Sequence, residues 1–265
     1  MTVCLTGDVH HASLETRDQA YLDGTEAEAA LRYAEIAADH GVPVTLFVTG
    51  KTAVEEPDSV RELIAMENVE VGGHNYWAFD TLAHKGFRGL TGSWNGPAWF
   101  QSWEVGRTVE ALDGLGADVR SWRDHAYRHD GKTAGVLSEN GITHFSDAVG
   151  PDERVREDEG VTVVPINTPP DHEHVYHAFR TPEFVAEDGF EGPFGSESVA
   201  VETWVEWVIE SVDRHASRGE AATVLAHPAC MALADGMGTF EDLCAALGEH
   251  DSIWMGEMGE VLNRE

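Results

Sequence analysis

Short apolar runs alternate with helical patterns along almost the whole chain, and this alternation restricts the fold more than any other feature. The strand-like runs are TVCLTGD, VPVTLFVTG, VEVGG, DVRSW, THFSD, VTVVPIN, ATVLAHP and SIWMG. Repeated strand and helix units favour parallel strands joined by right-handed crossovers. Seven or eight such units predict an α/β fold built as a distorted (β/α) barrel of parallel strands, with a doubly wound open sheet as the alternative.

Capping signals mark the starts of two helices. Thr25, with Glu28 three residues later, has the pattern of a capping box, and Gly41 marks the end of that helix. Ser59 and Glu62 repeat the pattern and predict a second helix start. The remaining helical patterns cover residues near 102–115, 131–140, 197–218 and 239–248.

Two long segments lack a clear periodicity. Residues 75–100 carry Trp77, Trp94 and Trp99 among glycines, and the segment is too long for a plain connector. We expect it to be a loop that shapes a site, in which the tryptophans either pack the loop or stack on a sugar face. Residues 168–195 are expected to form another long loop.

Length and composition fit a single domain that spans residues 1–265. With 265 residues, of which 42% are hydrophobic, the chain can bury one large core. It has no positively charged start followed by a long apolar run, and no window approaches the ~18 apolar residues of a membrane span. We expect a soluble, cytoplasmic protein unless export uses a signal outside this chain, and the oligomeric state is left open.

The charge balance is strongly acidic. Asp and Glu number 48 against 17 Lys and Arg, which gives a formal net charge of -31. Such a surface repels phosphate groups, which excludes nucleic acid and anionic membranes as partners. The only lysines are Lys51, Lys85 and Lys132, and the acids are scattered over the chain. This pattern is typical of a halophilic protein, because high salt screens the self-repulsion.

The three cysteines are Cys4, Cys230 and Cys244. Their odd number and the absence of a C-x-x-C spacing argue against a structural disulfide or a cysteine zinc site. We interpret them as small core residues.

Polar residues collect at the ends of the predicted strands. In a (β/α) barrel the carboxyl ends of the strands share one rim, where active sites form. We therefore expect a site drawn from the residues that end each strand, namely Asp8, His10 and His11; Thr49; His74; Arg123, Asp124 and His125; Asp147; Asn167, Asp171 and His172; and His227.

The order and spacing of these residues resemble the polysaccharide deacetylase superfamily, of NodB-homology or carbohydrate esterase family 4 type, over nearly the whole chain. CLTGDVH resembles the first motif of that family, which ends in Thr-Phe-Asp-Asp or Thr-Phe-Asp-x-Asp, and GVPVTLFVTG resembles its second strand. EVGGHNYW lies at the place of the His-x-x-x-His motif, WRDHAY at that of Arg-x-Pro-Tyr, and VLAHP at that of Leu-x-His.

The resemblance implies a NodB-type barrel and a divalent metal, usually zinc, held by an Asp and two His. It assigns Asp8 as the catalytic base, Arg123 as the arginine that orients it and His227 as the catalytic acid. A carboxylate can take a proton from the attacking water, and an imidazole can return one to the leaving nitrogen. A metal polarises the carbonyl oxygen and lowers the pKa of bound water to about 7.

Two departures from the family pattern affect the metal site. His10 stands where the second Asp of the family binds metal, and Ala78 stands where the second His would be. We therefore expect His10, His74 and Asp8 to hold a zinc-like ion, with a further ligand from His125 or His172, although His11, Asp80 and His174 are also candidates. Alternatively the metal is absent, as in the allantoinase-like amidohydrolases of the same superfamily.

The function expected from these features is hydrolysis of a non-peptide C–N bond, by a metal-dependent deacetylase of an N-acetylated sugar or polysaccharide. A metal-independent allantoinase-like amidohydrolase and a catalytically silent glycan-binding relative are the alternatives. A cytoplasmic address favours a soluble sugar precursor over a finished wall polymer. The residues expected to contact the carbohydrate or small amide substrate are Trp77, His125, Asp147 and Asp171.

Overall fold

The computed structural model describes residues 2–263, and its strands form one curled sheet. The order is β6-β7-β5-β4-β3-β2-β1-β8, and β9 pairs with β1. Among the strands of the described chain, β6 and β7 form the antiparallel pair, and every other pair is parallel. The strands are β1 Thr2–Val9, β2 Val44–Val48, β3 Val69–Gly73, β4 Ser121–Trp122, β5 His144–Phe145, β6 Arg156–Asp158, β7 Val161–Val163, β8 Ala222–Leu225 and β9 Asp251–Ser252.

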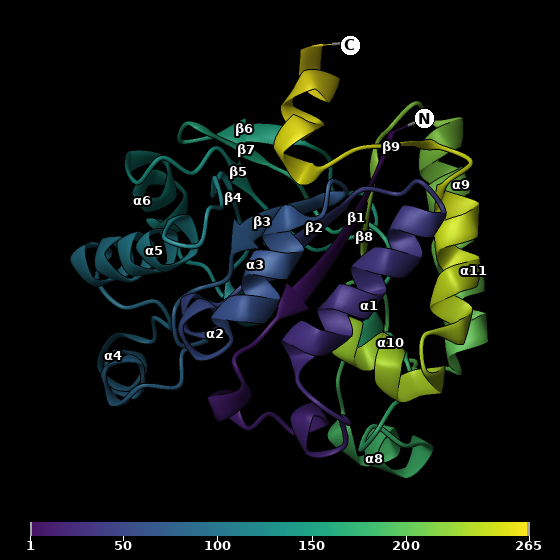
Figure 1. The fold of residues 1–265 in the computed structure, drawn as a ribbon, viewed down its shortest axis with the longest axis horizontal. Helices are drawn as coiled ribbons and strands as arrows, with labels where there is room; N and C mark the ends of the chain where they lie inside the picture. Colours follow the sequence, from purple (N-terminus) through teal and green to yellow (C-terminus); the bar gives the residue numbers. More distant parts are fainter. Residues whose placement is uncertain (1, 264–265) are drawn as a thin grey trace.

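The helices cover the outer face of the sheet. Figure 1 shows α9, α11 and α1 on one side and α2, α5 and α6 on the other, and neighbouring helices in each group contact one another. Their bounds are α1 Glu26–Asp39, α2 Gly50–Glu55, α3 Pro57–Ala65, α4 Leu82–Thr91, α5 Ala98–Asp113, α6 Thr133–Glu139, α7 Asp171–His174, α8 Pro182–Asp188, α9 Val201–Ser217, α10 Pro228–Asp235 and α11 Gly238–Leu247. Short 3-10 helices cover Ala12–Leu14, Asp18–Ala20, His125–Tyr127 and Met255–Asn263.

The sheet is a distorted barrel, as the alternation of strands and helices predicted. Its two edges approach each other through side chains: Asn167, which follows β7, donates from Nδ2 to the carbonyl of Ala221 at 3.0 Å and accepts from the amide of Thr223 at 2.8 Å. Strand β1 lies between β2 and β8 and is buried from Val3 onward. A parallel strand that is covered on both faces has a nearly continuous run of apolar residues, and this run allowed β1 to be predicted from the sequence.

The capping box at Thr25 is confirmed, because its hydroxyl accepts from the amide of Glu28 while the Glu28 carboxylate accepts from the amide of Thr25. The prediction of a second capping box at Ser59 and Glu62 is wrong. Helix α3 begins at Pro57, whose fixed φ suits the first helical position, and its N-cap residue Glu56 makes no side-chain cap bond.

The two segments expected to be loops contain short helices. Residues 75–100 contain α4, and residues 168–195 contain α7 and α8. The helices α2 and α10, which directly follow β2 and β8, were also not predicted. All of these helices have ten residues or fewer, so each carries too few turns for a periodicity to stand out.

No helix of residues 2–263 combines the length and the apolar character needed to cross a membrane. The loops that follow the carboxyl ends of the central strands gather at one end of the sheet, where α4 and α8 also lie (Figure 1). This end is where the site predicted from the strand ends must form.

Candidate active site

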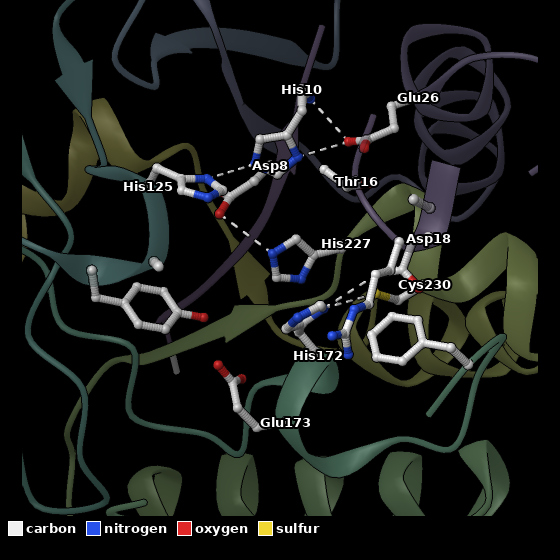
Figure 2. A pocket seen from close by; sticks show the side chains of 15 residues that line it. Asp8, His10, Thr16, Asp18, Glu26, His125, His172, Glu173, His227 and Cys230 are labelled. Atoms are coloured by element: carbon white, nitrogen blue, oxygen red, sulfur yellow. Dashed lines mark hydrogen bonds and ion pairs between the residues drawn. The ribbon is translucent and has the colours of Figure 1, made fainter. Parts of the chain in front are cut away.

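A cavity of about 300 Å³ opens beyond the carboxyl ends of the central strands. Figure 2 shows the side chains around it. The lining includes residues that follow β1, β4 and β8, together with the 3-10 helices and α7. The lining residues are Asp8, His10, Thr16, Arg17, Asp18, Glu26, His125, Ala126, Tyr127, His172, Glu173, Phe179, His227, Ala229 and Cys230.

Asp8 and Arg123 form a buried ion pair at the base of this cavity. Nη1 of Arg123 donates to Oδ1 of Asp8 at 2.9 Å, while Nη2 donates to the hydroxyls of Thr6 and Ser146. Both charged side chains are almost fully buried, since Arg123 is 0% exposed and Asp8 is 4% exposed. Burial acts to raise the pKa of Asp8, but Arg123 and the neighbouring histidines outweigh it and hold that pKa well below its usual value. Asp8 is therefore a fixed, ionised carboxylate.

His227 faces the second oxygen of Asp8. Its Nε2 lies 3.4 Å from Oδ2 of Asp8, and its Nδ1 donates to Oδ1 of Asp171 at 2.7 Å. The amide of His227 also donates to Asp171, at 2.6 Å to Oδ2. Burial acts to lower the pKa of His227, but the two carboxylates, led by Asp171, raise it well above its usual value. The ring is thus an imidazolium held in one orientation.

Three histidines meet on the other side of Asp8. Nε2 of His10 lies 3.3 Å from Nε2 of His74 and 3.0 Å from Nδ1 of His125, and the three nitrogens are all within 4.8 Å of one another. His74 also lies 3.7 Å from Oδ2 of Asp8. The three side chains come from the ends of β1, β3 and β4, which are joined in the sheet through β2.

The outward nitrogens of two of these rings are held by acceptors. Nδ1 of His10 donates to the buried carboxylate of Glu26 at 2.9 Å, and Nδ1 of His74 donates to the carbonyl of Arg123 at 2.8 Å. Nδ1 of each ring therefore carries a proton, and whenever His10 is neutral both Nε2 atoms present lone pairs to each other. Burial is the main cause that lowers the pKa of His74 to about 4 and that of His125 well below its usual value.

These residues fit a divalent metal. With His10 neutral, the three converging nitrogens share at most one proton, on Nδ1 of His125, and a cation at this point would satisfy the remaining lone pairs. Three neutral imidazoles are a ligand set of catalytic zinc sites, in which a fourth position is open to water. Two of the three rings here also have the hydrogen-bonded outer nitrogen that is typical of such ligands. His125 lies in the turn after β4 and brings the third ring nitrogen to this group.

The expected ligands Asp80 and His174 lie elsewhere. Asp80 pairs with Lys85 at 2.7 Å at the surface, and Nδ1 of His174 donates to the carbonyl of Glu197. His11 turns away from His10, as alternation along a strand predicts, and its Nδ1 bonds to Thr49.

Of the expected substrate contacts, His125 lines the cavity. Asp147 is buried and accepts from the amide of Asp124 at 2.8 Å, so it supports the turn that carries His125. Asp171 is fully buried behind His227. Trp77 packs against Tyr76 and Trp103 instead of lining the cavity.

Sequence reasoning missed the residues that orient the site from other parts of the chain. Glu26 is the first residue of α1, and Asp171 was assigned to substrate instead of to His227. The pattern before Glu26 indicated a helix start, but nothing in it indicated a histidine partner. Cys230 is buried, as expected of a core residue, yet it lies against His172, His177 and Asp18.

Solved structures share this fold over the whole chain. A polysaccharide deacetylase from Mycobacterium smegmatis is 18% identical with a TM-score of 0.73, and the match covers 99% of this chain and 89% of that one. A polysaccharide deacetylase from Pseudomonas aeruginosa PAO1 is 13% identical with a TM-score of 0.68, with 100% and 91% covered. The PuuE allantoinase is 12% identical with a TM-score of 0.67, with 99% and 89% covered.

No family model and no curated protein matches the sequence. The chain therefore has the fold of polysaccharide deacetylases and of an allantoinase, which confirms the fold that the sequence motifs implied.

Proposed function

We propose that the chain is a metal-dependent hydrolase that removes the acyl group from the nitrogen of a small N-acetylated sugar or a comparable small amide. The main support is the position of ionised Asp8, which contacts Arg123 on one oxygen and protonated His227 on the other, beside three converging histidine nitrogens.

The acid and base roles follow from the charge states. Asp8 is ionised and accepts the proton of the attacking water as general base. Arg123 holds this carboxylate in place, since the guanidinium is itself fixed by Thr6 and Ser146. His227 is protonated and donates its Nε2 proton to the leaving amine. Asp171 stabilises the imidazolium and holds the ring so that Nε2 points toward Asp8.

The metal would be held by His10, His74 and His125. When bound, it would polarise the scissile carbonyl and lower the pKa of water. Glu26 and the carbonyl of Arg123 accept from the two Nδ1 atoms and so direct both Nε2 atoms at one point, as the outer partners of histidine metal ligands do.

The cavity supports a small substrate. A volume of about 300 Å³ lies at the low end of ligand pockets and suits one sugar residue or a small amide. Tyr127, Glu173 and Thr16 line it and can bond to hydroxyl or amide groups of the substrate.

A metal-independent amidohydrolase is the second candidate. Burial acts to lower the pKa of His10, but the Glu26 carboxylate outweighs it and raises that pKa. A protonated His10 would donate from Nε2 toward His74 or His125 and would relieve the same lone-pair deficit without a metal. A catalytically silent glycan-binding protein is the third outcome that the experiment must separate.

The test combines metal analysis with product detection by NMR on a panel of N-acetylated monosaccharides, N-acetylated oligosaccharides and small amides that includes allantoin. We expect the wild type to hydrolyse a member of the panel and to lose activity on chelation. Asp8→Asn should lower the rate by about 10²–10⁴-fold. His125→Ala should lose one equivalent of metal and the activity, whereas His11→Ala, a buried histidine outside the site, should keep both.

The opposite outcomes assign the other functions. Activity that survives chelation and His125→Ala, but not Asp8→Asn, would establish the metal-independent hydrolase. A wild type that turns over no member of the panel, yet binds a sugar equally well with and without Asp8→Asn, would replace the enzyme with a binding protein.

A further inference from the structure

We propose that Asp18, His172, His177 and Cys230 form a second metal site, which takes zinc or a similar borderline cation and closes one wall of the cavity. These four residues, called the wall cluster below, are separate from the three histidines beside Asp8. The inference concerns a different set of ligands and does not rest on the proposed function.

The distances within the wall cluster fit tetrahedral coordination. Sγ of Cys230 lies 3.4 Å from Nε2 of His177 and 3.7 Å from Nδ1 of His172. Oδ1 of Asp18 lies 3.4 Å from Nε2 of His177, and Oδ2 of the same carboxylate lies 3.7 Å from Nδ1 of His172. Zinc–nitrogen bonds of about 2.0–2.1 Å and zinc–sulfur bonds of about 2.3 Å place ligand atoms of a tetrahedral site about 3.3–3.7 Å apart.

The wall cluster lacks the protons that a hydrogen-bonded network needs. Nδ1 of His177 donates to the carbonyl of Val175 at 2.9 Å, so Nε2 of the neutral ring carries a lone pair toward Cys230 and Asp18. Oδ1 of Asp18 is buried and makes no hydrogen bond within the described residues. The thiol proton of Cys230 can serve Nε2 of His177 or this oxygen, but not both. A cation would satisfy both.

The hydrogen bond from Nδ1 of His177 to the carbonyl of Val175 resembles the bonds that orient histidine ligands in metal sites. A backbone carbonyl that accepts from the other ring nitrogen fixes the tautomer and aims the free nitrogen at the metal. His177 is also fully buried, with its backbone bridged to Arg180. This ligand is held in place before any metal binds.

A neighbouring set of three residues is less suited to a metal. Asp171, His227 and Cys230 also place ligand atoms near one another. However, Asp171 and His227 already bond to each other at 2.7 Å, which occupies the ring nitrogen and the carboxylate. Cys230 is therefore assigned to the wall cluster.

The wall cluster brings together residues from separate parts of the chain. Asp18 lies in the 3-10 helix Asp18–Ala20, His172 in α7, and Cys230 in α10. Asp18, His172 and Cys230 all line the cavity (Figure 2), and the ring of His172 lies 5.6 Å from that of His227. A metal here would fix the wall that faces the catalytic acid, with four protein ligands and no position reserved for water.

Cobalt titration of the metal-free full chain tests the proposal directly, because a thiolate ligand gives Co²⁺ an intense near-ultraviolet charge-transfer absorption that imidazole and carboxylate ligands do not. We expect this absorption to appear in the wild type and to saturate by two added equivalents, because the three histidines beside Asp8 would compete for the same cobalt. It should be absent from Cys230→Ser and retained by Cys244→Ser, a matched change of a buried cysteine outside the cluster.

Two further measurements separate metal binding from misfolding. Circular dichroism should show that Cys230→Ser is folded, and if it is not, His177→Gln serves as the second variant, with the same expected loss of the absorption. Zinc should raise the melting temperature of the His125→Ala variant, whose first site is disabled, but not that of His125→Ala combined with Cys230→Ser. No thiolate absorption in the wild type, or the same absorption in folded Cys230→Ser, would overturn the second site.

Discussion

Arg123 gives the sharpest test of the site, because its guanidinium is the fixed partner of a buried carboxylate. The side chain is 0% exposed and donates to Asp8, Thr6 and Ser146. Removing one member of a buried ion pair leaves an uncompensated charge and costs about 3–5 kcal/mol. For Arg123→Met we expect the lower end of that range, since His227 still faces the other oxygen of Asp8.

The assay is thermal unfolding of the metal-free protein at neutral pH. At about 2–4 °C per kcal/mol for a chain of this size, a loss of about 3 kcal/mol lowers Tm by roughly 6–12 °C. The informative control is the double variant Asp8→Asn with Arg123→Met, in which neither buried charge remains. It should be more stable than Arg123→Met alone, because replacing both partners is often nearly neutral.

The pH dependence supplies a second check on Arg123. The folded pKa of Asp8 is depressed, so the pair contributes stability above the unfolded pKa of about 3.9, and that contribution is lost as pH falls toward the folded pKa. The stability gap between wild type and Arg123→Met should therefore narrow below about pH 4. A variant within about 1 kcal/mol of wild type at pH 7, or a double variant less stable than the single one, would refute the ion-pair argument.

Three further outcomes follow from the charges. Asp171→Asn removes the main cause of the raised pKa of His227, so the alkaline limb of the pH–rate profile should move down by about 1–3 pH units, and an unmoved limb would exclude His227 as the acid. Burial raises the pKa of Glu173 from 4.5 to about 7, so ionisation of Glu173 lowers the free energy of unfolding as pH rises from 4.5 to 7. The free energy of unfolding of Glu173→Gln should therefore exceed that of wild type by up to about 3 kcal/mol above pH 7 and should equal it below pH 4.5. Urea titrations at the two pH values can check this difference. Tm should rise with molar KCl because salt screens the net charge of -31, and melts that are flat in KCl would contradict the halophilic interpretation.

The sequence predicted the location of the site better than its internal contacts. Parallel strands end at one edge of a sheet, so any polar residue after an apolar run is directed to the same rim. Asp8, His74, Arg123 and His227 follow such runs, and the structure brings them into contact. Their catalytic roles stay predictions. The helices α2, α4 and α10 were not recognised, since tertiary packing stabilises short helices that carry a weak local signal.

The partners of these residues depend on distances that the sequence does not contain. His125 was expected to contact substrate, and it was one of several candidates for the ligand that completes the metal shell. The positive φ values of Ala126 and Tyr127 show the tight turn that brings its ring to His10. In the proposed metal site, His125 after β4 would supply the third nitrogen that position 78, occupied by Ala, cannot supply. The loops after β3 and β4 meet at the same rim, so the residues that converge there depend on the geometry of both turns and cannot be found from the spacing of one motif.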